Sequence, residues 1–406
     1  MAMSMKLILS ILFIYSLVEH NVCAQKPVLY NIRRYGAKRN QDIAKVLSNI
    51  WKEVVGSTRP SKILIPKGTW YLSQINIGGP NKAPVELNVR GTVNAPVDFT
   101  VMPDKKAQWI TIQHVNSFTI TGGGVFDGHG QEAWKKNDCV KNRNCVQLPI
   151  NLSFSAVNNS LIEYVTSKDS KNFHVKCIGC QNVAFRHFTI SAPGDSPNTD
   201  GIHVARSSNV NITDSVIKTG DDCVSIGDDT RELHIQNVAC GPGHGISIGS
   251  LGRNINEKDV SGIYIKNCNF TNTENGVRIK TWPSAPAVLT ISNLQFQDLI
   301  MENVGTPIDI NQEYCPYNLC KKTSPSQIKI SNVVLKNIRG TSATPEAVIL
   351  DCSKSKPCEN VVIGDIHLRY KRGGNSRVKS ARSVCANVKP ILKGKQDPPI
   401  CAHKPF

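Results

Sequence analysis

Acidic, basic and imidazole side chains recur at fixed places beside short apolar segments in the middle of the chain. Asp200, Asp222 and His244 each stand two residues before such a segment, and Arg278 and Lys280 alternate within a later one. Carboxylates held close together cannot all ionise easily, so one keeps its proton and serves as a general acid while another accepts a proton. A neighbouring histidine adjusts the shared proton. The pattern predicts acid–base chemistry on one strip of surface.

The two cations beside these acids indicate the kind of substrate. Arg278 and Lys280 would present a planar fork and a point charge to a carboxylate. Such a site suits hydrolysis of a glycosidic bond next to an acidic sugar. The alternatives are plain turn chemistry at Gly220-Asp221-Asp222 and Gly243-His244-Gly245, or an acidic ladder for Ca²⁺, as in a pectate lyase. Four elements in one register favour the catalytic interpretation, and we expect no metal ion and no cofactor.

Two interleaved series of short apolar alternations are expected to position these side chains. In each segment every second residue is apolar, as in a strand with one buried face. The first series lies at 117–120, 182–185, 209–212, 232–235, 262–265, 293–296, 332–335 and 360–363, and the second at 201–204, 223–226, 245–248, 276–279 and 307–310. From Val183 onward the first series recurs every 23 to 39 residues.

This recurrence predicts an all-β solenoid. Strands so short cannot bury a face alone, so successive turns of the chain (rungs) must cover one another, as in a parallel β-helix. Rungs lie about 4.8 Å apart. Alignment of Ile202, Val224, Ile246, Val277 and Ile308 therefore brings the acids, the histidine and the cations into one row. The alternative is an antiparallel sandwich, which the scarcity of two-residue hairpin turns disfavours.

Segments at the two ends of the solenoid differ from the repeats. Residues 42–55 carry apolar side chains at helical spacing and predict a short N-terminal helix that caps the open end of the stack. The Lys- and Arg-rich segment 371–395 is expected to be irregular and tied down by a disulfide between Cys385 and Cys401.

The N-terminus and the net charge limit the possible partners. Residues 1–24 combine a basic start, a short apolar run and small residues before a cleavage site, which predicts a secretory signal peptide. Residues 25–406 then form one secreted catalytic domain, which we expect to be a monomer. The formal net charge of +17 indicates a polyanionic partner. Secretion argues against nucleic acid, and no later apolar run is long enough to span a membrane, so an acidic polysaccharide is the expected partner.

Cysteine usage agrees with an oxidising compartment. Of the 14 cysteines, all but Cys23 follow the predicted signal peptide. Short loops predict the disulfides Cys139–Cys145, Cys223–Cys240, Cys315–Cys320, Cys352–Cys358 and Cys385–Cys401. Cys177, Cys180 and Cys268 remain, and a metal or redox pair at Cys177 and Cys180 is the less favoured alternative. N-glycosylation sequons begin at Asn151, Asn158, Asn211 and Asn269.

Four motifs in this order carry a resemblance to a known family. Asn198-Thr199-Asp200, Gly220-Asp221-Asp222, Gly243-His244-Gly245 and Arg278-Ile279-Lys280 look like the signature motifs of the polygalacturonase family, glycoside hydrolase family 28. The resemblance covers about residues 27–403, and the joint motif set is highly specific. The segment 305–320, with Tyr314-Cys315-Pro316, looks most like plant exopolygalacturonases, particularly the pollen group.

The resemblance implies both fold and mechanism. It implies a single-stranded right-handed parallel β-helix that hydrolyses α-1,4-linked galacturonan with inversion, in the degradation of cell-wall pectin. Carried over by motif, Asp221 protonates the leaving oxygen, Asp200 and Asp222 activate water, and His244 maintains the ionisation of the acid. The galacturonate-binding residues would be Asn198, Arg278, Lys280 and Tyr314.

Two further interpretations stay open beside exo action. An endo-acting enzyme differs only in whether one end of the cleft is blocked, which loop sequences do not reveal. A catalytically silent pectin-binding or allergen-type wall protein would need a broken motif, and none of the four is broken.

Overall fold

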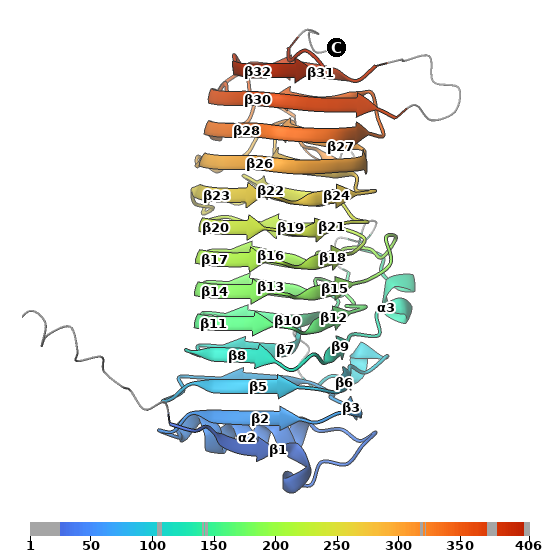
Figure 1. Cartoon of the computed structure of the whole chain (residues 1–406), viewed down its shortest axis with the longest axis vertical. Coiled ribbons are helices and arrows are strands. Elements are labelled where there is room, and N and C mark those ends of the chain that lie inside the picture. Colours follow the sequence, from blue (N-terminus) through green and yellow to red (C-terminus); the bar gives the residue numbers. More distant parts are fainter. Residues whose placement is uncertain are drawn as a thin grey trace, which may run out of the picture.

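Parallel strands stack along one axis into a right-handed parallel β-helix, as Figure 1 shows. This computed structural model describes residues 25–103, 108–139, 142, 145–316, 320, 322–371 and 380–401. The predicted signal peptide, residues 1–24, lies outside the described residues. The all-β solenoid predicted from the repeats is confirmed, and the antiparallel sandwich is wrong because the paired strands run parallel.

One stack of strands forms an 11-stranded sheet, called here the site sheet. Its strands are β4 (Ile75–Gly78), β7 (Gln108–Gln113), β10 (Ile150–Ser155), β13 (Val175–Ile178), β16 (Ile202–Ala205), β19 (Asp222–Ile226), β22 (Gly245–Leu251), β25 (Asn275–Thr281), β27 (Thr306–Asn311), β29 (Glu346–Asp351) and β31 (Arg382–Ala386). Each pairs in parallel with the strand one rung away.

The remaining strands form a 21-stranded sheet that covers the other sides of the solenoid. Its longer row contains β1 (Val28–Asn31), β2 (Ser61–Ile65), β5 (Val85–Val89), β8 (Phe118–Thr121), β11 (Asn158–Glu163), β14 (Gln181–Arg186), β17 (Ser208–Thr213), β20 (Arg231–Gln236), β23 (Val260–Lys266), β26 (Thr290–Val304), β28 (Lys329–Ser342), β30 (Glu359–Tyr370) and β32 (Ile391–Asp397). Its shorter row contains β3 (Thr69–Tyr71), β6 (Thr92–Asn94), β9 (Val125–Asp127), β12 (Thr166–Lys168), β15 (Thr189–Ser191), β18 (Val216–Lys218), β21 (Ala239–Cys240) and β24 (Asn269–Thr271). The rows merge where β26 pairs with both β23 and β24.

The core runs along the axis of the solenoid, where inward side chains of successive rungs stack. Ile202, Val224, Ile246, Val277 and Ile308 occupy matching positions of the site sheet and are almost fully buried. This is the alignment that the repeats predicted. Because side chains alternate along a strand, the residues that follow these five point outward from the solenoid.

The two ends of the solenoid differ in how well the sequence predicted them. Helix α2 (Ala44–Gly56) covers the first rungs with Leu47, Ile50, Trp51 and Val54 buried, so the predicted cap is confirmed. The expectation that 371–395 is irregular is wrong for its described part from 382 onward, since β31 and β32 add a last rung beside β29 and β30, while residues 372–379 lie outside the described residues. Most residues of β32 are exposed, so it lacks the apolar alternation that reveals the inner strands. The short helices are η1 (Ile32–Tyr35), η2 (Phe99–Val101) and α3 (Gln131–Lys135).

The covalent cross-links follow the sequence prediction. All five expected disulfides are formed. Cys177, Cys180 and Cys268 are buried free thiols. Among the described residues, no helix is both long and apolar enough to cross a membrane.

The four sequons lie in unlike environments. Asn151 is 2% exposed, and its amide donates to Ser167 Oγ at 3.0 Å and to the Lys168 carbonyl at 3.2 Å, so the folded chain hides it. Asn158 and Asn211 are half-buried on strands, and Asn269 is exposed at the start of β24.

Candidate functional site

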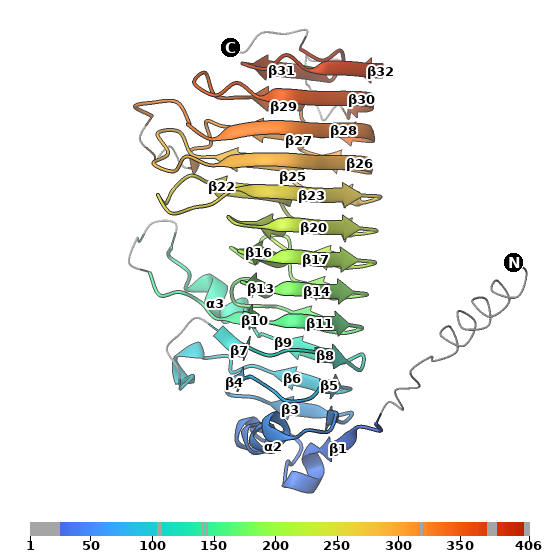
Figure 2. The same cartoon turned by 90° about the vertical axis from the view of Figure 1, so that its left-hand side faces the viewer.

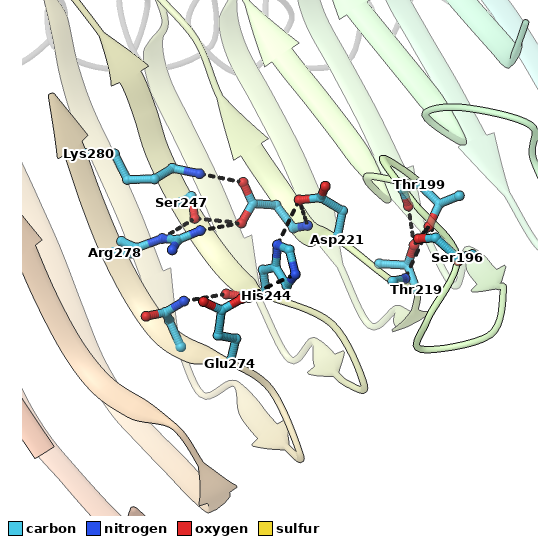
Figure 3. A network of polar contacts seen from close by, with 12 residues as sticks. Ser196, Thr199, Thr219, Asp221, His244, Ser247, Glu274, Arg278 and Lys280 are labelled. Carbon is cyan, nitrogen blue, oxygen red and sulfur yellow. Dashed lines mark hydrogen bonds and ion pairs between the residues drawn. The ribbon is translucent and has the colours of Figure 1, made fainter. Parts of the chain in front are cut away.

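The predicted catalytic residues lie along the same edge of the site sheet, where chain segments enter its strands. Asp200 precedes β16, Asp221 and Asp222 open β19, His244 precedes β22, and Arg278 and Lys280 lie within β25. Figure 3 shows Asp221, His244, Arg278 and Lys280 converging from neighbouring rungs, and Figure 2 shows the stacking of these rungs. We call these six residues the catalytic strip.

Glycines and buried hydroxyls shape the tight turns that carry Asp221 and His244. A Cβ on Gly220 would lie 2.0 Å from the Ser196 carbonyl oxygen, so only glycine permits this approach. The Gly220 N–H donates to Thr199 Oγ1 at 3.1 Å, and Thr219 Oγ1 also donates to that hydroxyl, at 2.8 Å. This network, drawn in Figure 3, anchors the turn beside the acids.

A bulge changes one detail of the predicted register. Asp222 pairs with Gly245 rather than His244, because Cys223 is an extra residue before the pairing resumes at Val224 and Ile246. The expectation that Asp222 and His244 hold matching positions is therefore wrong by one residue. His244 lies beside Asp221 instead. The backbone N–H of His244 donates to the Asp221 carbonyl at 2.7 Å, and the ring Nδ1 lies 3.0 Å from Asp221 Oδ1.

Asp222 is the centre of a buried ion cluster. Its Oδ2 accepts from Lys280 Nζ at 2.9 Å, and its Oδ1 accepts from Ser247 Oγ at 2.7 Å and from Arg278 at 3.4 Å. Arg278 is 8% exposed and Lys280 is 6% exposed. The two cations thus both contact Asp222, and this one carboxylate faces two positive charges. Asp222 alone balances only one of these two positive charges.

Burial and nearby charges shift the pKa values of Asp200 and Asp222 in opposite directions. Burial, followed by the negative charges of Asp221 and Asp222, raises the pKa of Asp200 well above its usual range. Burial would also raise the pKa of Asp222, but the charges of Lys280 and then Arg278 outweigh it, and the pKa of Asp222 is lowered. Of these two acids, Asp200 therefore keeps its proton more readily and Asp222 ionises more readily.

His244 lies between two carboxylates. Its Nε2 is 3.2 Å from Glu274 Oε2, on the side opposite Asp221. Burial opposes the charged imidazole, yet the hydrogen bond to Asp221 and the charges of Asp221 and Glu274 raise the pKa of His244. The imidazolium form therefore persists to higher pH than in a free histidine.

The two remaining predicted binding residues, Tyr314 and Asn198, contact different parts of the molecule. The ring of Tyr314 lies 5.9 Å from the Arg278 guanidinium carbon and 5.5 Å from Lys280 Nζ. Asn198 donates to Asn172 Oδ1 at 2.6 Å, and Asn172 donates to the Leu148 carbonyl at 3.0 Å. Tyr314 thus joins the cations, whereas Asn198 is connected to the chain that follows α3.

Several polar residues of the site were not anticipated. Ser247 bridges Asp222 and Arg278: its hydroxyl donates to Asp222 Oδ1 and accepts from Arg278 Nε at 3.3 Å. Ser247 and Asp309 occupy the outward positions that register with Arg278, so the same alignment could have revealed both. Glu274 precedes β25 and carries no comparable signal in the sequence.

The strip also contains a set of atoms that could approach a metal ion. Asp221, Asp222 and His244 each offer one ligand atom, and these atoms lie within 4.8 Å of one another. Both oxygens of Asp222 already accept hydrogen bonds from Arg278, Lys280 and Ser247, so a divalent cation would have to compete with two positive charges.

Known proteins of one family are similar to this chain over most of its length. The model of glycosyl hydrolases family 28 matches residues 55–395. A polygalacturonase of Nicotiana tabacum is 50% identical over 374 residues, covering 92% of each chain. An exopolygalacturonase of Oenothera organensis is 51% identical over 363 residues, covering 89% of this chain and 98% of that protein.

A solved structure has the same architecture. The crystal structure of endo-xylogalacturonan hydrolase from Aspergillus tubingensis superimposes with a TM-score of 0.76 and 23% identity, covering 89% of this chain and 96% of that one. At this identity the likeness concerns the fold.

Proposed function

Because the chain belongs to family 28 of the glycosyl hydrolases, we propose that it hydrolyses the α-1,4 bonds of galacturonan with inversion and acts from chain ends. The observation that carries the proposal is the unbalanced positive charge beside the paired acids. Asp222 neutralises only one of Arg278 and Lys280, so the carboxylate of one galacturonate residue supplies the missing anion.

Asp221 is the general acid in this mechanism. Its Oδ1 accepts from the Asp222 N–H at 2.7 Å and lies beside His244 Nδ1, which leaves Oδ2 to carry the proton for the departing oxygen. When the proton leaves, the imidazolium of His244 stabilises the carboxylate that forms. General acid catalysis of this kind contributes about 10²–10⁴ in rate.

Asp222 is the base that draws a proton from water. Lys280 and Arg278 favour its ionised form, and Asp200, whose pKa is raised by burial, positions the same water. Oxygens of Asp221 and Asp222 within 4.8 Å are closer than the roughly 6.5–9.5 Å usual for inverting pairs. We still propose inversion, because hydrogen bonds from Arg278, Lys280 and Ser247 make Asp222 a poor nucleophile, while Oδ2, which accepts only the bond from Lys280, can still accept one from the water.

Exo action is supported by the connection 128–149 between β9 and β10. Its described residues include α3, which lies outside the stack in Figure 2, and the Cys139–Cys145 disulfide, whereas the connections 169–174 and 219–221 of later rungs are short. The bonds from Leu148 through Asn172 to Asn198 link its end to the substrate side. A projecting connection at this place suits a cleft closed at one end.

Product analysis on polygalacturonate tests the proposal. Exo action predicts that galacturonate alone accumulates, in the β-anomeric form first if inversion operates, as followed by NMR. Mixed oligomers would assign endo action. An unsaturated product that absorbs in the near ultraviolet and disappears with chelator would assign a lyase, and absence of any new reducing end would leave a silent binding protein.

The same proposal includes the setting in which the enzyme works. A predicted signal peptide at 1–24 and five disulfides in the described chain support secretion into the cell wall. The net charge of +17 supports attraction to an acidic polysaccharide. The enzyme then acts as a monomer on pectate, without a cofactor.

A further inference from the structure

Asp309 is a buried carboxyl group that the mechanism above does not use. It lies on β27 in register with Arg278 of β25, with Ile308 and Ile310 buried on either side, so its side chain points outward beside the two cations. It is only 8% exposed, and its Oδ1 is buried without a hydrogen-bond partner. On the next rung the matching residue is Ile349, which offers no donor.

An orphaned buried carboxyl oxygen is costly unless the group serves a purpose or is neutral. The charged groups that act on Asp309 come from three neighbouring segments: Arg278 and Lys280 on β25, Asp351 at the end of β29, and Glu274 before β25. Burial raises the pKa of Asp309 to about 6, against the opposing charges of Arg278 and Lys280, and Asp351 and Glu274 add to the rise. The group is therefore neutral in mildly acidic solution and negative in neutral solution.

The protonation of Asp309 decides the charge of the ion cluster. With Asp309 neutral, Asp222 faces Arg278 and Lys280 alone, and one positive charge is left for a substrate carboxylate. With Asp309 ionised, this charge is already balanced within the protein. A galacturonate carboxylate then has to displace or repel an anion that lies on the rung next to Arg278.

We propose that Asp309 is a specificity-determining residue of the carboxylate-binding subsite, where its neutral form leaves the cations to the acidic sugar and its ionised form competes with that sugar. This inference rests on the proposed function. It adds that the preference for a charged substrate depends on pH through a residue that takes no part in bond cleavage.

Steady-state kinetics separate this role from a structural one. We expect the KM of the unaltered enzyme for polygalacturonate to rise roughly tenfold from pH 5 to pH 7, the size of one charge-assisted hydrogen bond. In Asp309→Asn, which keeps the shape but cannot ionise, KM should stay nearly level while the pH profile of kcat is unchanged. Asp214→Asn is the matched control. It also replaces one carboxylate by an amide, but at the turn between β17 and β18 of the 21-stranded sheet, where Asp214 accepts a hydrogen bond from Asn237. The control should retain the rise in KM.

Calorimetry on the unaltered enzyme keeps the proposal testable even if the variant does not fold. A bound carboxylate favours neutral Asp309, so binding of galacturonate near pH 6.5 must take up a proton. Titrations in two buffers of different ionisation enthalpy measure this uptake, and Asp309→Asn should abolish most of it.

The possible results are distinct. If Asp309→Asn shows the same rise in KM, or if the unaltered enzyme takes up no proton, the role of Asp309 is overturned while hydrolysis stands. If the unaltered enzyme neither cleaves polygalacturonate nor binds galacturonate at pH 5, the proposed function fails and the role of Asp309 falls with it.

Discussion

Two rows of polar side chains run along this solenoid, and they differ in residue type, burial and charge. In the asparagine ladder (Asn116, Asn159, Asn182 and Asn209), the side-chain amides of the last three donate to the asparagine of the preceding rung, at 2.8, 2.7 and 3.2 Å. The ladder is neutral and exposed, and it repeats one residue type. In the catalytic strip the groups change along the rungs from carboxylates to a histidine to cations, the charges are largely buried, and a bulge at Cys223 shifts the register.

The difference shows where chemistry can arise in a repetitive fold. The ladder satisfies each amide with an identical neighbour, so every rung stabilises the next and none can give up a partner. The strip keeps the same backbone spacing but mixes acids, a histidine and cations, and two of its cations share the single carboxylate of Asp222. Regular rungs provide the positions, and departure from the repeat provides a site that a charged substrate completes.

The largest effect is expected when the base of the strip is neutralised. Asp222→Asn should lower kcat on polygalacturonate by roughly 10²–10⁴-fold, because an amide cannot accept the proton from water. It should also lower the melting temperature, since Arg278 and Lys280 lose their buried partner. The control Asp214→Asn removes a charge elsewhere and should leave kcat unaltered. A rate for Asp222→Asn within a few-fold of the unaltered enzyme would remove Asp222 from the mechanism.

A smaller effect is expected at the histidine. Glu274 helps to hold His244 in its charged form, so Glu274→Gln should lower the pKa of His244 and move the alkaline limb of activity to lower pH. The shift should be on the order of half a pH unit, because Glu274 is 61% exposed and screened by solvent. The pH profile of kcat measures it, and activity at pH 5 should change little. A limb that stays in place, or moves to higher pH, would contradict the role of Glu274.

The smallest effect on catalysis is expected in the ladder. Asn182→Ala removes two amide hydrogen bonds and places a Cβ-bearing residue without a local polar group at φ 55°. It should lower the free energy of unfolding by about 1–3 kcal/mol, measured by denaturant titration, without changing kcat/KM. Asn182→Gly is the matched control, since it loses the same bonds but tolerates positive φ and should be less destabilised. Altered kcat/KM would mean that the two rows are coupled.

Much of the fold could be predicted because its determinants are local. Strands such as 209–212 show period-2 alternation, and short loops define pairs such as Cys352–Cys358. The register of Ile202, Val224 and Ile246 followed from the spacing of these segments and is confirmed. The last rung was missed because β32 buries little apolar surface and therefore shows no alternation.

The sequence predicted which residues gather at the site, but not which of them bind one another. Motifs placed Asp222, Arg278 and Lys280 on one strip, but only the structure shows that both cations bind Asp222, across 56 and 58 residues of chain. The bulge at Cys223 moves His244 from Asp222 to Asp221, and alternation alone does not reveal an inserted residue. Asp309 was not predicted because its role depends on the burial of its carboxyl group. Burial at an outward position depends on neighbouring rungs and loops rather than on local sequence.

The most direct test of the central assignment compares Asp221→Asn on two substrates. In polygalacturonate the leaving sugar oxygen must be protonated, whereas the fluoride of α-galacturonosyl fluoride departs without a proton from a carboxylic acid. The account predicts that Asp221→Asn loses roughly 10²–10⁴ in kcat on polygalacturonate and only a small factor on the fluoride. Equal losses on both substrates would contradict Asp221 as the general acid.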